Sequence, residues 1–128
     1  LSGLKPVTEA TDSRNKVQEA RSKRMSSYEK LDVYMKAYAV SLKIHRITLR
    51  FPRYEQYRGI ASQLRDSSKS LVSNLIEGYA FKKLRPGRFV NHLEISIGSC
   101  DETRLWLRYG RDLGYLSDEE YEGVGGCL

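Results

Sequence analysis

Apolar side chains recur every three or four residues between residues 31 and 51. One line follows spacings of 4, 3, 4, 3 and 4: Val33, Ala37, Val40, Ile44, Ile47 and Phe51. A second line lies beside it: Leu31, Tyr34, Tyr38, Leu42, His45 and Leu49. Together they predict a helix over residues 31–51 with a wide apolar face, as the core of a helical bundle requires. Because proline disfavours helical geometry at the preceding residue, Phe51 should end it.

A second helix is predicted to begin between Tyr57 and Gly59 and to end at Tyr79. Its inward stripe mixes apolar with small and polar residues: Ile60, Leu64, Ser67, Leu71, Asn74, Leu75 and Gly78. The small members allow another helix to approach closely. The basic segment 81–88 that follows is interrupted by Pro86 and Gly87, which predicts a linker.

A third helix is predicted over residues 88–113. Its apolar stripe is interrupted by Arg104 and consists of Val90, Leu93, Ile97, Cys100 and Leu107. Gly114 suits a left-handed stop, and Ser117 with Glu120 forms a capping box that opens a short fourth helix. No stretch alternates with a two-residue period for long, so the chain is predicted to be all-α, an antiparallel up-and-down helical bundle.

Residues 1–27 form a polar leader, and residues 28–128 the predicted bundle domain. Thr11–Met25 has helix-forming residues, but only Val17, Ala20 and Met25 are apolar, so the leader is expected to be mobile or docked on a neighbour. No segment resembles a signal peptide or approaches the length of an apolar membrane span. Two cysteines make no disulfide framework, which favours a reduced, cytoplasmic setting.

Charge is unevenly distributed over the chain, whose formal net charge is +6. Residues 31–90 carry twelve basic and four acidic side chains, whereas residues 91–128 carry three arginines and eight acids. Such polarity suggests a surface for a polyanion, or acidic and basic faces that meet between subunits. Ordinary solvated helix faces are the simpler interpretation.

Two groups of cations are candidates for binding nucleic acid. The first lies in the linker, close to the rings of Tyr79, Phe81 and Phe89: Lys82, Lys83, Arg85 and Arg88. The second lies on one stripe of the first helix: Lys36, Lys43 and Arg50. A ring of subunits would repeat either patch and make it polyvalent.

A polar cluster on the second helix is expected to be structural. Ser73 with Glu77 and Asn74 with Gly78 are pairs four residues apart, so they occupy neighbouring sectors of the helix. Glu77 should pair with an arginine such as Arg65 or Arg104, inside the bundle or between subunits, and Gly78 should admit another helix. No base or nucleophile accompanies the carboxylate at a catalytic spacing, and neither histidine nor Cys100 has ligand-forming neighbours. We therefore expect no enzyme activity, no metal, no cofactor and no small-molecule substrate.

Four stretches carry a resemblance to a known family. They are Tyr28–Tyr34, Phe51–Tyr57 with Ser62–Arg65, Ser73–Tyr79, and Phe89–Cys100 continuing to Asp112–Leu116. In this order and spacing the chain resembles the bacterial four-helix-bundle proteins encoded in intervening sequences of 23S rRNA genes. It departs from the pattern in a short fourth helix, a longer leader, and an acid at Asp66 where the family places a basic or small residue.

The resemblance implies a bundle that assembles into a ring-like homo-oligomer, with a pentamer favoured over a dimer. Relatives that accompany diversity-generating reverse transcriptases use such a basic barrel to bind nucleic acid and the polymerase. A short fourth helix should also leave apolar surface on the other three, near Val33 and Trp106, which is typical of an interface. Two functions stay open: a homo-oligomer that binds RNA or DNA through basic surfaces, or an assembly scaffold with no nucleic-acid role.

Overall fold

The computed structural model describes residues 12–19 and 28–128, which divide between two units, Leu1–Leu31 and Asp32–Leu128. In the first unit, residues 12–19 are helical, which confirms that part of the helix predicted over Thr11–Met25. The remainder of that prediction lies outside the described residues. The second unit is the bundle.

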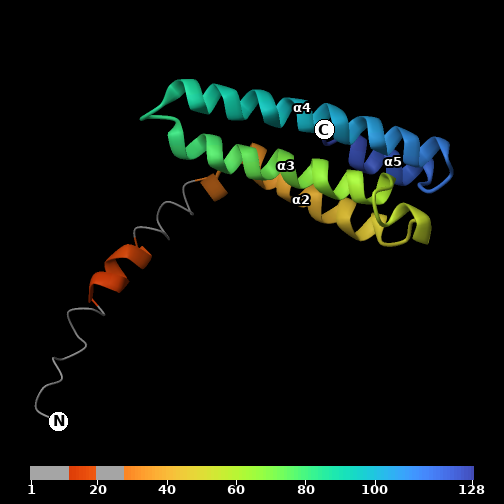
Figure 1. Cartoon of the computed structure of the whole chain (residues 1–128), viewed down its shortest axis with the longest axis horizontal. Helices are drawn as coiled ribbons and strands as arrows, with labels where there is room; N and C mark the ends of the chain where they lie inside the picture. Colours follow the sequence, from red (N-terminus) through yellow and green to blue (C-terminus); the bar gives the residue numbers. More distant parts are fainter. Residues whose placement is uncertain (1–11, 20–27) are drawn as a thin grey trace, which may run out of the picture. The chain divides into compact units, whose positions relative to one another are not determined.

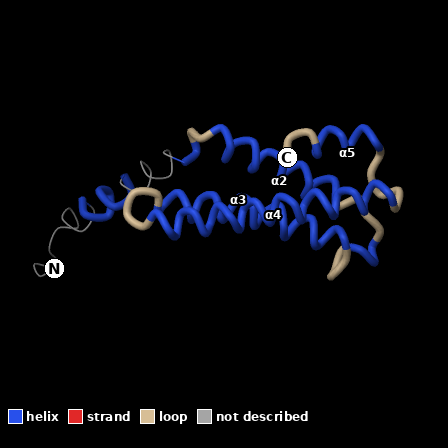
Figure 2. Tube along the Cα trace, turned by 90° about the horizontal axis from the view of Figure 1, so that it is seen from above, coloured by secondary structure: helices blue, strands red, loops and turns tan. Residues whose placement is uncertain are grey.

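Four α-helices and one short 3-10 helix make up the bundle unit, and none of its residues is in a strand. They are α2 (Asp32–Thr48), η1 (Arg53–Glu55), α3 (Ile60–Phe81), α4 (Pro86–Asp112) and α5 (Asp118–Gly125). α3 packs against α4 on one side and α2 on the other, while α5 packs against α4 and α2 (Figure 1). α3 and α4 run side by side over most of their length (Figure 2). The all-α bundle predicted from the sequence is confirmed.

The main core lies toward the end of the bundle that contains α5. It is formed by Val40, Ile44, Phe51, Ala61, Leu64, Leu107, Leu116 and Val124. A smaller cluster of Ala37, Leu71 and Val72 continues it, with Cys100 packed against its edge. The first apolar line of α2 therefore packs inward as predicted, except at Val33, which is 56% exposed. Half of the second line is outside: Tyr38, Leu42 and Leu49 are exposed, so the assignment of these three to the core is wrong, whereas Tyr34 packs against the smaller cluster.

The apolar stripe predicted for α4 is only partly its inward face: Leu107 is buried and Cys100 packs at the edge of the core, whereas Val90 and Ile97 are exposed. Ile97 is 63% exposed, whereas the buried positions of this helix are Ser96, Ser99, Thr103, Leu107 and Gly110. The reason is the hydroxyl-rich face that α3 presents. The Thr103 hydroxyl donates to Ser67 Oγ at 2.9 Å, and Ser70 Oγ lies 2.9 Å from Ser99 Oγ. Small paired hydroxyls satisfy one another and let the two backbones come close.

Gly78 extends this close seam toward the α3–α4 turn, as the sequence predicts. A Cβ at position 78 would lie 2.8 Å from the Cβ of His92 and 3.5 Å from the carbonyl oxygen of Phe89. No side chain larger than hydrogen fits there without moving one of the helices.

Helix ends differ from the predicted ones in ways that individual contacts explain. α2 ends at Thr48 rather than Phe51, because Gln56 Nε2 donates to the carbonyl oxygens of both Thr48 and Phe51. Pro86 does not lie in a linker: it is the first residue of α4, a position that needs no N–H donor. The stop at Gly114, with φ of +79°, and the Ser117–Glu120 capping box are confirmed. α5 ends at Gly125, within the glycine-rich segment 123–126.

We expect Gly78→Ala to destabilise the bundle and Gly98→Ala to stabilise it. Both glycines are inside helices, where alanine is favoured by about 1 kcal/mol. At position 98 nothing lies within 4 Å of the new methyl group, so that gain is kept. At position 78 the clash with His92 should outweigh it and leave a net loss of about 1–2 kcal/mol. Urea unfolding of both variants measures the difference, and an equal change in the two would contradict the close seam.

The pairing of Arg50 with Glu120 should make part of the stability depend on pH. The backbone N–H of Ser117 and the Arg50 guanidinium lower the pKa of Glu120 below its ordinary 4.5. A depressed folded-state pKa contributes stability above the unfolded pKa, and this contribution is lost as the pH falls below about 4.5. Glu120→Gln should therefore cost up to about 1 kcal/mol at pH 7 and progressively less as the pH falls below about 4.5. Unfolding midpoints across that range test this, with the exposed Glu119→Gln as the control that should show no such trend.

Candidate functional site

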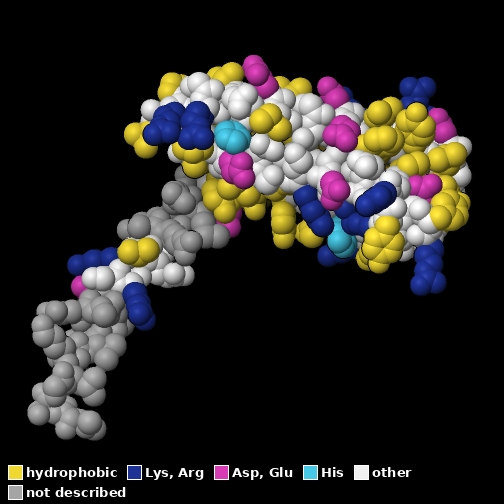
Figure 3. Space-filling view, in the orientation of Figure 1, with side chains coloured by type: hydrophobic (Ala, Val, Ile, Leu, Met, Phe, Trp, Pro, Cys, Tyr) yellow, Lys and Arg dark blue, Asp and Glu magenta, His cyan; other side chains and the backbone are white. Residues whose placement is uncertain are grey.

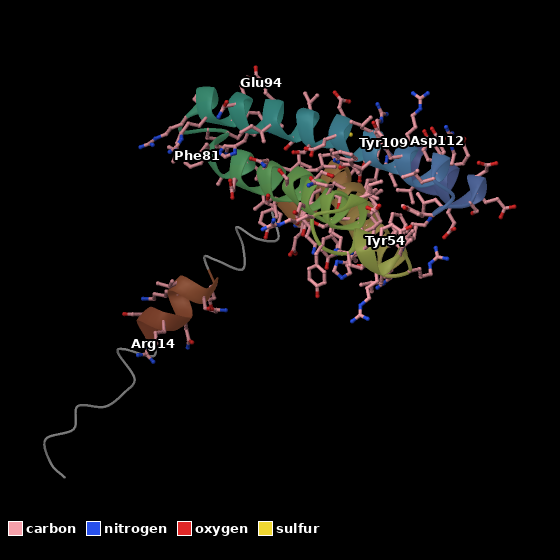
Figure 4. The ribbon with its side chains drawn as sticks, turned by 45° about the vertical axis from the view of Figure 1, so that its right-hand side comes forward. Arg14, Tyr54, Phe81, Glu94, Tyr109 and Asp112 are labelled. Atoms are coloured by element: carbon pink, nitrogen blue, oxygen red, sulfur yellow. The ribbon has the colours of Figure 1, made fainter. Side chains whose placement is uncertain are left out.

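The α3–α4 turn holds the first group of predicted cations together at one end of the bundle. Lys82, Lys83, Arg85 and Arg88 are all exposed, and no described carboxylate lies within ion-pair distance of any of them. Lys and Arg side chains gather visibly at this end (Figure 3), around Phe81 (Figure 4). Four unneutralised cations within seven residues form a local field that attracts anions.

Local structure explains why these cations share one turn. The backbone N–H of Arg85 donates to the carbonyl oxygen of Phe81 at 2.8 Å, and Pro86 begins α4 directly afterwards. Helix α3 therefore passes into α4 with only a few residues between them. The tight connection keeps all four side chains at the tip, whichever way each of them points.

Aromatic rings at the tip hold two of the cations. The guanidinium carbon of Arg88 lies 4.5 Å from the centre of the Phe81 ring, and Lys82 Nζ lies 5.7 Å from that of Tyr79. These are cation–π distances. They orient the stems of both side chains while leaving their N–H donors available to an anion.

His92 joins this tip to the polar cluster of α3, a role that the sequence analysis missed. Its ring stacks on Phe81 at a centroid distance of 6.0 Å, and its Nδ1 lies 3.0 Å from Asn74 Oδ1. The Glu77 carboxylate lies 3.7 Å from the same nitrogen. The sequence carries no indication of this contact, because eighteen residues and a turn separate Asn74 from His92.

The polar cluster therefore forms contacts other than those predicted for Glu77. Within the chain the Glu77 carboxylate lies nearest His92 and not Arg65 or Arg104, and the predicted pairing between subunits stays a prediction. Arg65 instead donates to Thr48 Oγ1 at 3.1 Å and to both the side chain and the backbone carbonyl of Gln56. Ser73 is exposed and bonds the carbonyl oxygen of Ser70 on its own helix. The cluster is thus two structural features, one that ties α3 to α4 and one that fixes the α2–α3 connection.

Lys36 and Lys43 of the second group lie on α2, and Arg50 lies in the turn that follows it. Arg50 pairs with Glu120, and Lys43 Nζ lies 3.4 Å from the position that a Cβ on Gly123 would occupy. Lys36 borders an apolar groove of about 560 Å³ beyond the end of α5, together with Val33, Leu93 and Ile97. One member of this stripe is therefore neutralised within the chain, and the stripe is a weaker anion site than the turn.

Neither a metal centre nor a membrane span is found in the parts of the chain that the structure describes. Those parts hold no group of three His, Cys, Asp or Glu side chains placed to share a metal ion. Among the described helices, none combines the length and the apolar character needed to cross a bilayer. His45 is half-buried and Cys100 packs at the edge of the core, as expected for structural residues.

Comparison with known proteins supports the architecture. The bundle is similar to the crystal structure of a protein of unknown function from the S23 ribosomal protein family of Bacteroides thetaiotaomicron VPI-5482, with a TM-score of 0.66 and 21% identity. The match covers 74% of this chain and 86% of that one. At this identity it shows the fold alone. No curated protein matches the sequence.

The sequence pattern of the family described as 23S rRNA-intervening sequence protein matches residues 29–126. Since this match spans most of the 128 residues, the chain belongs to the 23S rRNA-intervening sequence protein family.

Proposed function

We propose that this protein is a non-catalytic RNA-binding module that contacts phosphates through the α3–α4 turn. The observation that carries the proposal is the set of four exposed cations at that turn: Lys82, Lys83, Arg85 and Arg88. They lie within one tight connection, and described acids neutralise none of them.

The chemistry of the turn suits a phosphate backbone better than base edges. Lysine and arginine donors without neighbouring Asn or Gln in a groove-reading helix favour contacts that ignore sequence. Phe81 and Tyr79 offer ring faces beside the cations, as proteins that bind unpaired nucleotides do. We therefore expect affinity for structured RNA with exposed loops and little preference for sequence.

Self-association raises the affinity of such a small patch. One turn supplies four charges, whereas a homo-oligomer, with a pentamer favoured, repeats them around a ring and binds a polyanion at several points. Exposed apolar residues on α2 and α4, including Leu42 and Leu105, are the kind of surface that assembly covers.

We expect light scattering coupled to size exclusion to give a mass near five times the 14.7 kDa of one chain. The measurement is made on the full chain at micromolar concentration. A dimer would present two such turns, so RNA binding would still be expected but with lower affinity than for a pentamer. A monomer would reject self-association.

Replacing Lys82, Lys83, Arg85 and Arg88 together by Gln should weaken RNA binding by a similar factor for all sequences. In a plot of the logarithm of affinity against the logarithm of salt concentration, the slope should become shallower by roughly 0.7 to 0.9 for each phosphate contact removed. Fluorescence anisotropy with an RNA hairpin and a scrambled partner of the same length measures both quantities. The oligomer should persist, because the turn contributes little to the core.

A charge-matched variant provides the control. Arg53, Arg58, Arg104 and Arg108 are exposed and lie away from the turn, so changing them to Gln alters net charge equally but should reduce binding much less. Equal losses in the two variants would mean that net charge, and no particular site, binds RNA. Unchanged binding in the turn variant would move the site, most simply to Lys36 and Lys43. Assemblies indifferent to RNA altogether would favour the scaffold function.

A further inference from the structure

Both cysteines of the chain line the same groove. It is the groove of about 560 Å³ beyond the end of α5, which α2, α3 and α4 border, and its wall includes Cys100 and Cys127. Cys100 is half-buried on α4, Cys127 is exposed in the turn after α5, and both thiols are free. This combination suits a redox-active pair, in which the accessible thiol is oxidised first and the neighbouring thiol resolves it.

The turn after α5 folds back against α4. The Cys100 thiol donates to the carbonyl oxygen of Leu128 at a sulfur–oxygen distance of 3.8 Å (Figure 1). Leu128 also packs against both core clusters, which holds this part of the turn in place. Cys127 is the next residue along the backbone, and adjacent Cα atoms are about 3.8 Å apart. Tertiary structure therefore brings the two thiols near each other, although the last turns of α4 and the whole of α5 separate them in the sequence.

Glycine residues give Cys127 the freedom to reach Cys100. Cys127 follows Gly125 and Gly126, and a Cβ on Gly125 would meet nothing within 4 Å. Its thiol donates to the carbonyl oxygen of Gly123 at 3.8 Å, a weak contact that a rotation about χ1 breaks. A disulfide joins Cα atoms that are about 4.4–6.8 Å apart. The adjustment that reaches this range falls on a turn that glycine makes adaptable, while Cys100 keeps its place on α4.

We propose that Cys100 and Cys127 form a modification site that a peroxide converts into an intrachain disulfide. The exposed Cys127 thiolate attacks one oxygen of hydrogen peroxide and breaks the O–O bond, which gives a sulfenic acid and a hydroxide that takes up the thiol proton to become water. The Cys100 sulfur then attacks the sulfenic sulfur, and the S–S bond forms as the hydroxyl group leaves with the Cys100 proton as a second water. The two thiols lose two electrons, and the peroxide gains them.

The disulfide joins the turn after α5 to the middle of α4. It encloses the second half of α4 and all of α5 in one covalent loop. Because such a loop restricts the unfolded chain, the oxidised protein should unfold at a higher temperature than the reduced protein. Neither cysteine belongs to the α3–α4 turn, so the test of this inference does not depend on RNA binding.

Peptide mapping after mild oxidation tests the proposal on the full chain. The reduced protein receives an equimolar amount of hydrogen peroxide, remaining thiols are blocked with N-ethylmaleimide, and trypsin follows. We expect an intact monomer that has lost two hydrogen atoms and carries no maleimide, and a linked pair of tryptic peptides covering residues 89–104 and 112–128. The midpoint of thermal unfolding should rise by several degrees and return to its first value with dithiothreitol.

Three variants separate this site from general thiol reactivity. Cys100→Ser and Cys127→Ser should each give no linked peptides within one chain. Cys127→Ser with Ser73→Cys keeps two thiols but moves one to an exposed position in the other groove, between α2 and α3, and should form no intrachain bond.

Linked peptides from a wild-type monomer on a non-reducing gel support the proposal. It is overturned if both wild-type thiols stay open to maleimide, or if oxidation of Cys127 stops at a sulfur acid while Cys100 still reacts. It is equally overturned if the main product joins two chains, or if the variant with the displaced thiol forms its own intrachain bond at the wild-type rate.

Discussion

The bundle depends on the close approach of α3 and α4. Hydroxyl groups meet along this seam in pairs, Thr103 with Ser67 and Ser99 with Ser70, and Gly78 leaves room for His92 at its end. Small residues contribute little apolar area, so the seam obtains stability from hydrogen bonds and from dispersion between backbones that lie near each other. Because small side chains occupy most of the inward face of α4, its large apolar residues other than Leu107 lie elsewhere. The seam thus determines which surface α4 offers to other molecules.

The same seam positions the candidate site. It holds α3 and α4 together up to the turn, where Phe81 contacts both His92 and Arg88. Two of the four cations, Lys82 and Arg88, are therefore held by rings at this end of the bundle. At the opposite end, Arg50 with Glu120 and the capping box fix α5 against α2. This pairing uses one of the cations of α2 and leaves the turn as the stronger electropositive feature.

Local chemistry predicted much of the fold, and contacts between helices account for what it missed. The capping box at Ser117, the left-handed Gly114 and the first apolar line of α2 depend on near neighbours, so their patterns are readable in the sequence. The inward face of α4 is not, because periodicity weighs hydrophobicity and ranks Ile97 above Ser96. Only their partners on α3 make Ser96 and Thr103 buried positions: Ser96 donates to the carbonyl oxygen of Leu71 and Thr103 to the hydroxyl of Ser67. The cations of the turn were predictable as a group because they are neighbours in the sequence. The contact between Asn74 and His92 was not predictable, because it joins residues on different helices.

The errors in the predicted core are informative about function. Tyr38, Leu42 and Leu49 follow a helical period as regular as that of the buried line, yet they are exposed, as is Ile97 on α4. A monomer gains nothing from apolar residues at such regular outward positions, and an extended apolar surface has a solubility cost. Periodic apolar faces beyond the needs of one chain's core are what subunits of an assembly display. The proposed self-association would account for this exposed periodicity.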